Sequence, residues 1–313
     1  MNRREFLTGG GLALATGCVA PRTKEMIRCD EWSLAPGPVL NFSCRDLAEP
    51  LNVWVIGDSH LALHDERDDA HADFYARMAR CPGDPQAFVK TLEKAKKANA
   101  DLVLLVGDII SFPTLANVEF IRKSLDESGV RWAYVAGNHD WHFEGTPGTD
   151  EAQRALWISK RLSPLYPKGA DPLCYSCVVK GVRFVMIDDS DYLITPSQLA
   201  FWHAEVEKGD PTVLVMHIPI WTKGWRESET LGHPSWGAAI DRYWQIERRQ
   251  RWPEKATPET FAFVESVRRT PNLLGVLTGH IHSLMAARDS GQNFFSVPAS
   301  RSGDHLRVLF RPL

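Results

Sequence analysis

The sequence predicts an α/β protein, and three observations support this class. Short, continuous apolar runs recur along the chain, as they do in strands that are buried on both faces of a sheet. Helical patterns lie between several of these runs, and such alternation is typical of α/β architectures. The apolar runs also end at Asp, Asn or His, which places polar side chains where strands stop.

Length and composition exclude several classes of protein. Of the 313 residues, 44% are hydrophobic and 24% are charged, which is typical of globular proteins and not of disordered or fibrous ones. The formal net charge of −3 disfavours a basic nucleic-acid-binding protein, so no nucleic-acid partner is expected. No apolar run reaches the roughly 18 residues that a transmembrane helix needs.

The first 20 residues predict an export signal. Arg3 and Arg4 precede a short, weakly apolar stretch, which is typical of the twin-arginine route. The four residues that end at Cys18 resemble a lipoprotein cleavage box, and Cys18 would then carry the lipid. The alternative is an ordinary cut nearby, for example after Ala20. We expect an exported protein of the periplasm or cell envelope, attached to a membrane only through this lipid anchor.

The strands are expected in the domain that follows. Residues 21–50 form a Pro-containing lead-in segment without a clear period, and the domain is expected over residues 51–313. Six apolar runs predict strands over 51–56, 101–106, 131–136, 182–187, 212–216 and 273–278.

Four helices are expected between these strands. Periodic apolar positions predict them over 85–99, 118–128, 196–208 and 258–269. Thr195 and Thr257 each precede a proline, and they are expected to be N-caps with that proline in the first turn.

The six cysteines suggest structural thiols. Beyond Cys18, the chain contains Cys29, Cys44, Cys81, Cys174 and Cys177, some of which an exported protein could pair. Cys174 and Cys177 resemble a CxxC motif, but they lie in an apparent strand. Residues three apart on a strand point to opposite faces, so a redox or zinc role is not expected for them.

The polar residues at the strand ends suit a metal centre. They are Asp58, His60, Asp108, Asn138, His139, His217, His280 and His282. Ligands bind outside the carboxyl ends of strands in open α/β sheets, so these distant residues could converge. Carboxylates and imidazoles bind divalent transition metals, and the set is large enough for two ions, with Mn, Fe or Zn all acceptable. Two close ions form a clamp suited to phosphate ester hydrolysis.

Taken in order, these motifs resemble the calcineurin-like metallophosphoesterase family. They are Asp58-x-His60, Gly107-Asp108, Gly137-Asn138-His139-Asp140, His217 and Gly279-His280-x-His282, and they extend from about residue 51 to 285. The resemblance implies a four-layer α/β/β/α sandwich. It also implies hydrolysis of small phosphate monoesters or diesters by a hydroxide that bridges two ions.

The resemblance implies two sets of ligands around one shared carboxylate. One ion would be held by Asp58, His60 and His282. The other would be held by Asn138, His217 and His280. Asp108 would bridge the two ions.

The residues after Asn138 would serve the substrate. By the same resemblance, His139 is the catalytic histidine, oriented by Asp140, and it would protonate the leaving oxygen. Trp141 and His142 follow directly, and they are our candidates for substrate contacts.

Other features refine the substrate. The residue three after Asp108 is Ser111, where purple acid phosphatases carry a metal-binding tyrosine, so their mixed-iron site is not expected. The chain also lacks the GDxVDRG signature of protein Ser/Thr phosphatases. A run of Asp and His over residues 64–73 is interpreted as a solvated loop, with the lining of the cleft as the alternative.

One segment departs from the alternation of strands and helices. Residues 221–252 carry many charges and five tryptophans between His217 and the helix that leads to His280. We interpret the segment as an insertion that caps the active site. The alternative is that its tryptophans only pack it onto the body, as large aromatics usually do.

Two other functions stay open at this point. One is a non-catalytic member of the family that keeps the fold as a binding scaffold, although such a protein would be expected to lose ligands. The other is a nuclease, for which the sequence offers no basic groove with interleaved aromatics.

Overall fold

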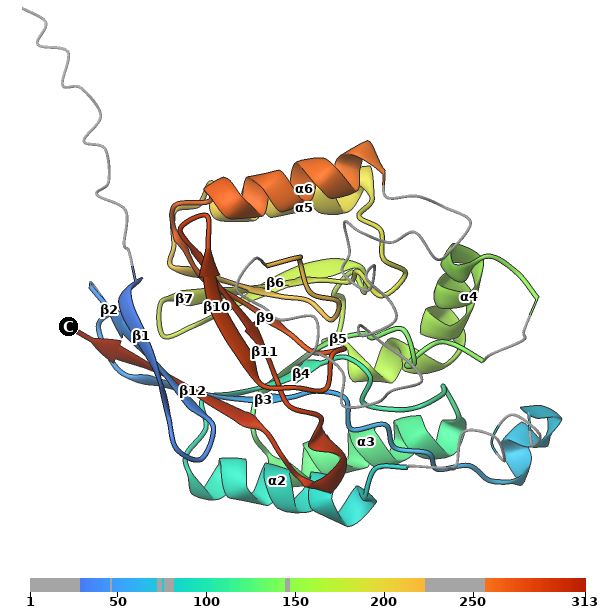
Figure 1. Cartoon of the computed structure of the whole chain (residues 1–313). Helices are drawn as coiled ribbons and strands as arrows, with labels where there is room; N and C mark the ends of the chain where they lie inside the picture. The colour runs from blue at the N-terminus through green and yellow to red at the C-terminus, as the bar shows by residue number, and fades with distance from the viewer. Residues whose placement is uncertain (1–28, 46, 72–74, 76–81, 144–146, 223–256) are drawn as a thin grey trace, which may run out of the picture.

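The computed structural model describes residues 29–45, 47–71, 75, 82–143, 147–222 and 257–313. These residues form two six-stranded sheets, and helices cover the outer face of each sheet (Figure 1). The expected α/β/β/α sandwich is therefore confirmed.

The first sheet contains the earlier strands and the last one. Its order is β1-β2-β12-β3-β4-β5, in which β3, β4 and β5 run parallel and β12 runs antiparallel to β3. The strands are β1 (Cys29–Ala35), β2 (Val39–Cys44), β3 (Leu51–Ile56), β4 (Leu102–Val106), β5 (Trp132–Val135) and β12 (Leu306–Pro312). The parallel strands β3 to β5 are joined through helices, which cover the outer face.

The second sheet contains the later strands. Its order is β10-β11-β9-β8-β7-β6, in which β11, β9, β8 and β7 run parallel to one another and the edge strands β10 and β6 run antiparallel to them. The strands are β6 (Cys174–Val179), β7 (Val182–Ile187), β8 (Thr212–Val215), β9 (Leu273–Thr278), β10 (Met285–Asp289) and β11 (Gln292–Ser296).

Helices form the two outer layers. In Figure 1, α2 (Pro85–Lys97) and α3 (Leu115–Ser128) lie against the first sheet, and α5 (Pro196–Val206) and α6 (Pro258–Arg269) lie against the second. Both expected N-caps are confirmed: the side chains of Thr195 and Thr257 accept hydrogen bonds from Gln198 N and Thr260 N. The shorter helices are η1 (Glu66–His71), α4 (Asp150–Trp157), η2 (Ile158–Leu162), η3 (Ser163–Leu165) and η5 (Ser300–Ser302).

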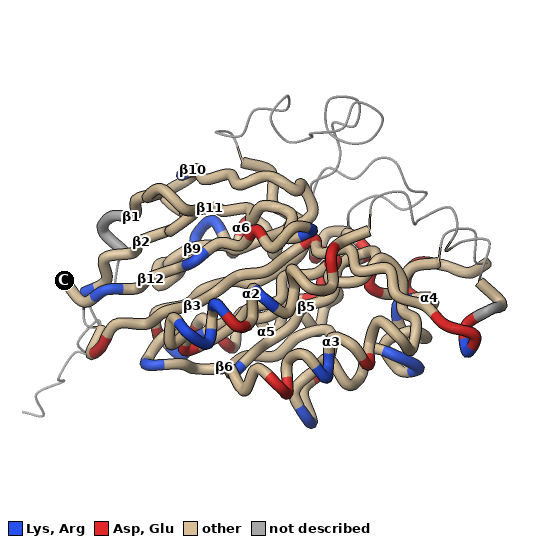
Figure 2. The backbone as a smooth tube through the Cα atoms, turned by 90° about the horizontal axis from the view of Figure 1, so that it is seen from below, with Lys and Arg blue, Asp and Glu red and all other residues tan. Residues whose placement is uncertain are grey.

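Alternating side chains of β7 link the layers. Phe184 and Met186 are buried in the core between the sheets, whereas Val185 and Ile187 are buried against the helices α5 and α6. Successive residues of a strand face opposite sides, so a continuous apolar run fills two cores. The outer helices carry charges of both signs that are interspersed along α2 and α3 (Figure 2).

The cysteines of β6 behave as expected for structural thiols. Cys174 is buried against the outer helices, and Cys177 packs against the core between the sheets, so the two thiols face opposite sides. Both are free, and burial raises the pKa of the Cys174 thiol to about 11. A thiol of this kind is a poor nucleophile and a poor metal ligand.

The expected lead-in segment contains a hairpin that belongs to the first sheet. Strands β1 and β2 pair antiparallel, and β2 continues the sheet by pairing with β12, where Phe42 lies opposite Phe310. In β2 only alternate residues are fully buried, among them Leu40 and Phe42. This period-two pattern differs from the continuous apolar runs that marked the other strands, which is why the predicted domain began at residue 51.

Several predictions lie outside the described residues. They concern the export signal at residues 1–20, the lipid site Cys18, Cys81, and the insertion at 221–252 apart from Trp221 and Thr222. Within the part of the chain that is described, no helix has the length and apolar character needed to cross a bilayer.

Candidate metal centre

The predicted ligands gather where the two sheets present their strand ends. Asp58 follows β3, Asp108 follows β4 and Asn138 follows β5, all in the first sheet. His217 follows β8, and the His280–His282 segment follows β9, in the second sheet. Hydrogen bonds join the two groups, since both carboxylate oxygens of Asp58 accept from the backbone amide of His280 at 3.0 Å.

The first cluster consists of Asp58, His60, Asp108 and His282. One ligand atom from each residue lies within 4.8 Å of the others, a spacing that could hold a metal ion. The Nε2 atoms of His60 and His282 are 3.0 Å apart, and His282 Nε2 lies 3.3 Å from Asp58 Oδ1. His60 Nε2 lies 3.8 Å from Asp108 Oδ2.

The second cluster consists of Asp108, His217 and His280, again with ligand atoms within 4.8 Å of one another. Asp108 Oδ2 lies 3.3 Å from His217 Nε2, and it is also the oxygen that faces His60. Asp108 is thus common to the two clusters. A carboxylate shared in this way is placed to bridge two ions.

Two buried atoms near these clusters fit a cation. Asn138 Oδ1 is buried and has no hydrogen-bond partner among the described residues, and the buried His217 Nε2 faces the Asp108 carboxylate, 3.3 Å from its Oδ2. A buried polar atom without a partner costs free energy, and a metal ion would satisfy a carbonyl oxygen and an imidazole nitrogen alike. His217 Nδ1 lies 2.8 Å from the carbonyl oxygen of Val106, so the ring proton belongs on Nδ1 and the lone pair on Nε2.

Several candidate ligands have a left-handed backbone conformation, which is strained for residues other than glycine. Nine non-glycine residues of the described chain have positive φ, and five of them are candidate ligands. These five are Asp58 (52°), His60 (48°), Asp108 (50°), His280 (71°) and His282 (57°). Each such residue costs on the order of 1–3 kcal/mol, and clusters of them mark sites where the surrounding structure imposes a geometry.

Glycines allow the strand ends to approach each other. A Cβ on Gly107 would lie 2.5 Å from His217 Nδ1, and its φ of +85° also favours glycine. A Cβ on Gly137 would collide with the carboxylate and backbone nitrogen of Asp108. The glycines that precede Asp108 and Asn138 are therefore required by close packing of the ligands.

His139 and Asp140 lie beside the first cluster. The His139 ring is half-buried at 4.8 Å from the ring of His60, and its backbone amide donates to Asp108 Oδ1 at 2.8 Å. Asp140 is fully buried, and its two oxygens accept from the backbone amides of Ile110 and Gly137. Asp140 thus joins the loops after β4 and β5, and any effect on the His139 ring passes through the loop that carries both residues.

The two candidate substrate contacts differ in exposure. Trp141 is only 2% exposed, and its Nε1 donates to Ser190 Oγ at 2.8 Å. That burial assigns the indole to packing and leaves it little surface for a substrate. His142 is half-buried, with its ring 5.7 Å from that of Trp141.

Burial favours the neutral form of three imidazoles near the clusters. Burial holds the pKa of His60 and of His280 well below the usual range, and burial also lowers the pKa of His139. Burial alone would lower the pKa of His217 too, but the Asp108 carboxylate raises it to about 10. Neutral imidazole is the metal-binding form, and an ion between His217 and Asp108 would take the place of that proton.

The loop after β7 is part of the site, although no motif in the sequence marks it. Asp189 Oδ1 accepts from the backbone amides of His217 and Ile218, and Tyr192 Oη lies 3.1 Å from His280 Nε2. The available signal was the Asp-Asp-Ser that ends this strand, in the same place as the other polar residues. It was missed because it matches no metal-binding spacing.

The acidic run at residues 64–73 differs from a plain solvated loop. Asp68 is 4% exposed; it accepts from the Leu115 amide at the start of α3 and pairs with Arg161 at 2.9 Å. Asp65 remains at the surface, where it pairs with Arg67. Asp68 thus has a structural role and Asp65 a surface role, and residues 72 and 73 of the run lie outside the described residues.

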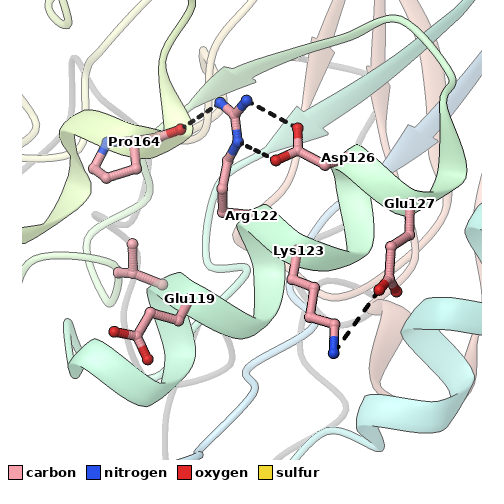
Figure 3. A pocket seen from close by; sticks show the side chains of 7 residues that line it. Glu119, Arg122, Lys123, Asp126, Glu127 and Pro164 are labelled. Carbon is pink, nitrogen blue, oxygen red and sulfur yellow. Dashed lines mark hydrogen bonds and ion pairs between the residues drawn. The ribbon is translucent and has the colours of Figure 1, made fainter.

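A pocket on the outer face of α3 lies apart from these clusters (Figure 3). Its charged residues pair with one another: Arg122 with Asp126, and Lys123 with Glu127. Arg122 also donates to the carbonyl oxygen of Pro164. The pocket contains none of the candidate ligands.

Known proteins share this fold. A family model described as calcineurin-like phosphoesterase matches residues 51–284. A protein of Psychrobacter arcticus, described as a probable cyclic nucleotide phosphodiesterase, is 30% identical over 122 residues, which is 39% of each chain.

Two solved structures are similar in fold. A dimetal phosphatase from Danio rerio gives a TM-score of 0.50 at 13% identity, over 80% of this chain and 88% of that one. A purple acid phosphatase from yellow lupin (Lupinus luteus) seeds gives a TM-score of 0.52 at 12% identity, over 85% of this chain and 47% of that one.

Proposed function

We propose that this chain, which belongs to the calcineurin-like phosphoesterase family, hydrolyses small phosphate esters with two divalent transition-metal ions. The observation that carries this proposal is the position of Asp108, which is common to two clusters of candidate ligands. Asp58, His60 and His282 would hold one ion, and Asn138, His217 and His280 the other. Mn, Fe and Zn all suit this donor set.

Hydrogen bonds and backbone conformation within the chain orient the candidate ligands for the reaction. Two bound ions would lower the pKa of water and neutralise charge on the phosphoryl group. The His139 amide holds Asp108 Oδ1 at 2.8 Å, which turns Oδ2 toward His60 and His217. The left-handed backbone at five ligands arranges these side chains before any ion binds.

His139 would act on the leaving group. Its half-buried ring stands beside His60, at the edge of the two clusters, where it can reach an ester bound between the ions. Burial lowers the pKa of His139, but the negative charge of a bound phosphate ester would favour its protonated form. His139 would then transfer the proton to the departing oxygen, and Asp140 would position it by fixing the loop.

The favoured substrates are phosphate esters of small molecules. Ser111 Oγ donates to the backbone carbonyl of His60 at 3.1 Å, so this side chain has a structural role where purple acid phosphatases have a ligand. A cyclic nucleotide is the first diester to test, because a partial relative is described as a phosphodiesterase for such compounds.

The alternative functions receive less support. A binding scaffold without activity would not need seven candidate ligands, a strained backbone and His139 together. A nuclease would need a basic groove, and the formal net charge of −3 gives no support to one.

The proposal includes a location outside the cytoplasm. It rests on Arg3, Arg4 and the segment that ends at Cys18. Fractionation of cells that express the Cys18→Ser variant would test the anchor, because the mature protein should then leave the membrane fraction.

An activity screen tests the proposed reaction. The metal-free protein would be reconstituted with Mn, Fe or Zn and assayed on a phosphomonoester, a linear diester and a cyclic nucleotide. We expect turnover of at least one ester that depends on added metal. A full complement of bound ions without turnover of any ester would favour the scaffold instead.

A further inference from the structure

The loop of residues 188–192, which follows β7, contacts both histidines of the second cluster. Asp189 accepts hydrogen bonds from the backbone of His217 and Ile218, at 3.0 and 3.1 Å. Tyr192 places its hydroxyl oxygen 3.1 Å from His280 Nε2, and the two rings meet edge to face with centroids 5.6 Å apart. The loop thus supports both histidines of the second cluster through these contacts.

The loop is held rigidly for this contact. Tyr192 has a φ of 67°, which is uncommon for a bulky residue, and its amide donates to Asp189 O at 2.7 Å. Arg154, which is 3% exposed, forms ion pairs with Asp188 and Asp191. A strained turn that is fixed by a buried guanidinium indicates that the fold imposes the position of the Tyr192 hydroxyl beside His280.

The contact selects one nitrogen of His280. A neutral imidazole has one N–H and one lone pair, and only the nitrogen with the lone pair can bind an ion. When Nε2–H donates to Tyr192 Oη, the lone pair lies on Nδ1. His217 shows the complementary arrangement, because its Nδ1 faces Val106 O and leaves Nε2 for an ion.

We propose that Tyr192 is a positioning residue that holds His280 with Nδ1 directed to the second metal ion. This inference rests on the proposed two-metal function. Tyr192 itself does not bind the ion; its hydroxyl fixes the ring orientation and the tautomer of a ligand. Loss of a hydrogen-bond partner of this kind weakens metal binding by about 10–100-fold.

The test compares Tyr192→Phe with the unchanged protein and with Tyr75→Phe as the control. Tyr75 is buried, whereas Tyr192 is half-buried, and the Tyr75 hydroxyl donates to Asp68 O at 3.1 Å, outside both clusters. Each metal-free protein is titrated with Zn²⁺ by calorimetry. We expect two ions in the unchanged protein and in the control, and in Tyr192→Phe one ion at normal affinity with the other weakened about 10–100-fold.

Nitrogen NMR of the Zn²⁺-loaded unchanged protein gives an independent reading. We expect the His280 ring to carry its proton on Nε2 and to bind zinc through Nδ1, with the signals assigned by a His280→Gln variant. Zinc on Nε2, or two unchanged affinities in Tyr192→Phe, would overturn the role of Tyr192 and leave the proposed function intact. An unchanged protein that binds no ions would overturn both.

Discussion

The two clusters of the metal centre are built in different ways. All four residues of the first cluster have left-handed backbone, so their side chains converge through strain in the short segments that carry them. In the second cluster, the rings of His217 and His280 are held by Val106 and Tyr192, which belong to other parts of the chain. Left-handed backbone is therefore present at every residue of the first cluster and at two of the three residues of the second, and the second cluster also depends on a supporting loop.

This difference indicates which contacts the binding of the second ion depends on. A substitution far from the reaction can disturb the second cluster by moving the loop of residues 188–192. The first cluster should respond mainly to changes in its own ligands. The following predictions probe this contrast, from the largest expected effect to the smallest.

Asp108→Ala should affect both clusters at once. The shared carboxylate is removed, so both ions should be lost and turnover should fall to background. Metal analysis of the purified variant measures this directly. His60→Ala is the matched comparison, because it should remove only the first ion. Two ions per chain in Asp108→Ala would show that the carboxylate bridges nothing.

His139→Ala should leave both clusters intact. The residue is not among the proposed ligands, so both ions should remain, while turnover falls about 10²–10⁴-fold. The loss should be smaller for a nitrophenyl ester, whose leaving group needs no proton, than for an alkyl ester. Equal losses on the two esters would argue that His139 orients the phosphate, and loss of an ion would make it a ligand.

Arg154→Met should disturb the second cluster selectively. The substitution leaves Asp188 and Asp191 buried without their cation, which typically destabilises a protein by about 3–5 kcal/mol. Chemical denaturation measures the loss, and calorimetry should show weaker binding of one ion only. Equal weakening of the binding of both ions would mean that the two clusters depend on the same supporting contacts.

Trp141→Phe should have the smallest effect. It removes the hydrogen bond to Ser190, which contributes about 1 kcal/mol, and leaves both clusters in place. The midpoint of thermal unfolding should fall by a few degrees with KM unchanged. A raised KM without a change in unfolding would restore Trp141 as a substrate contact.

The parts of the fold that sequence could predict are those with uniform burial. The strands 182–187 and 273–278 and the helix 258–269 have the predicted bounds, because a continuous apolar run or a Thr-Pro start leaves little choice. The β1–β2 hairpin, β10, β11 and β12 were not predicted. In β2 and β12 only alternate residues are buried, and this pattern is weak in so short a strand.

In the site, too, some residues could be predicted from the sequence and others could not. The ligands lie in short motifs at strand ends, and the position and spacing of these motifs predicted Asp58, His60, Asp108 and His282. Tyr192 and Arg154 could not be found so, because their roles depend on contacts with His280 and Asp188, which lie far away in the chain. Residues that can bind a metal are therefore easier to predict from a sequence than the residues that orient those ligands.

The strand β12 also has a consequence for how the chain folds. It lies between β2 and β3, and Arg307 reaches Asn52 across 255 positions of sequence. The first sheet therefore cannot close during synthesis until the segment after residue 305 has emerged, and such long-range pairing is slow. Until β12 pairs, the β1–β2 hairpin cannot join the first sheet, and the edge of β3 stays open. Refolding monitored by hydrogen exchange should show protection of β1 and β2 no earlier than that of β12, and earlier protection would separate the hairpin from this closing step.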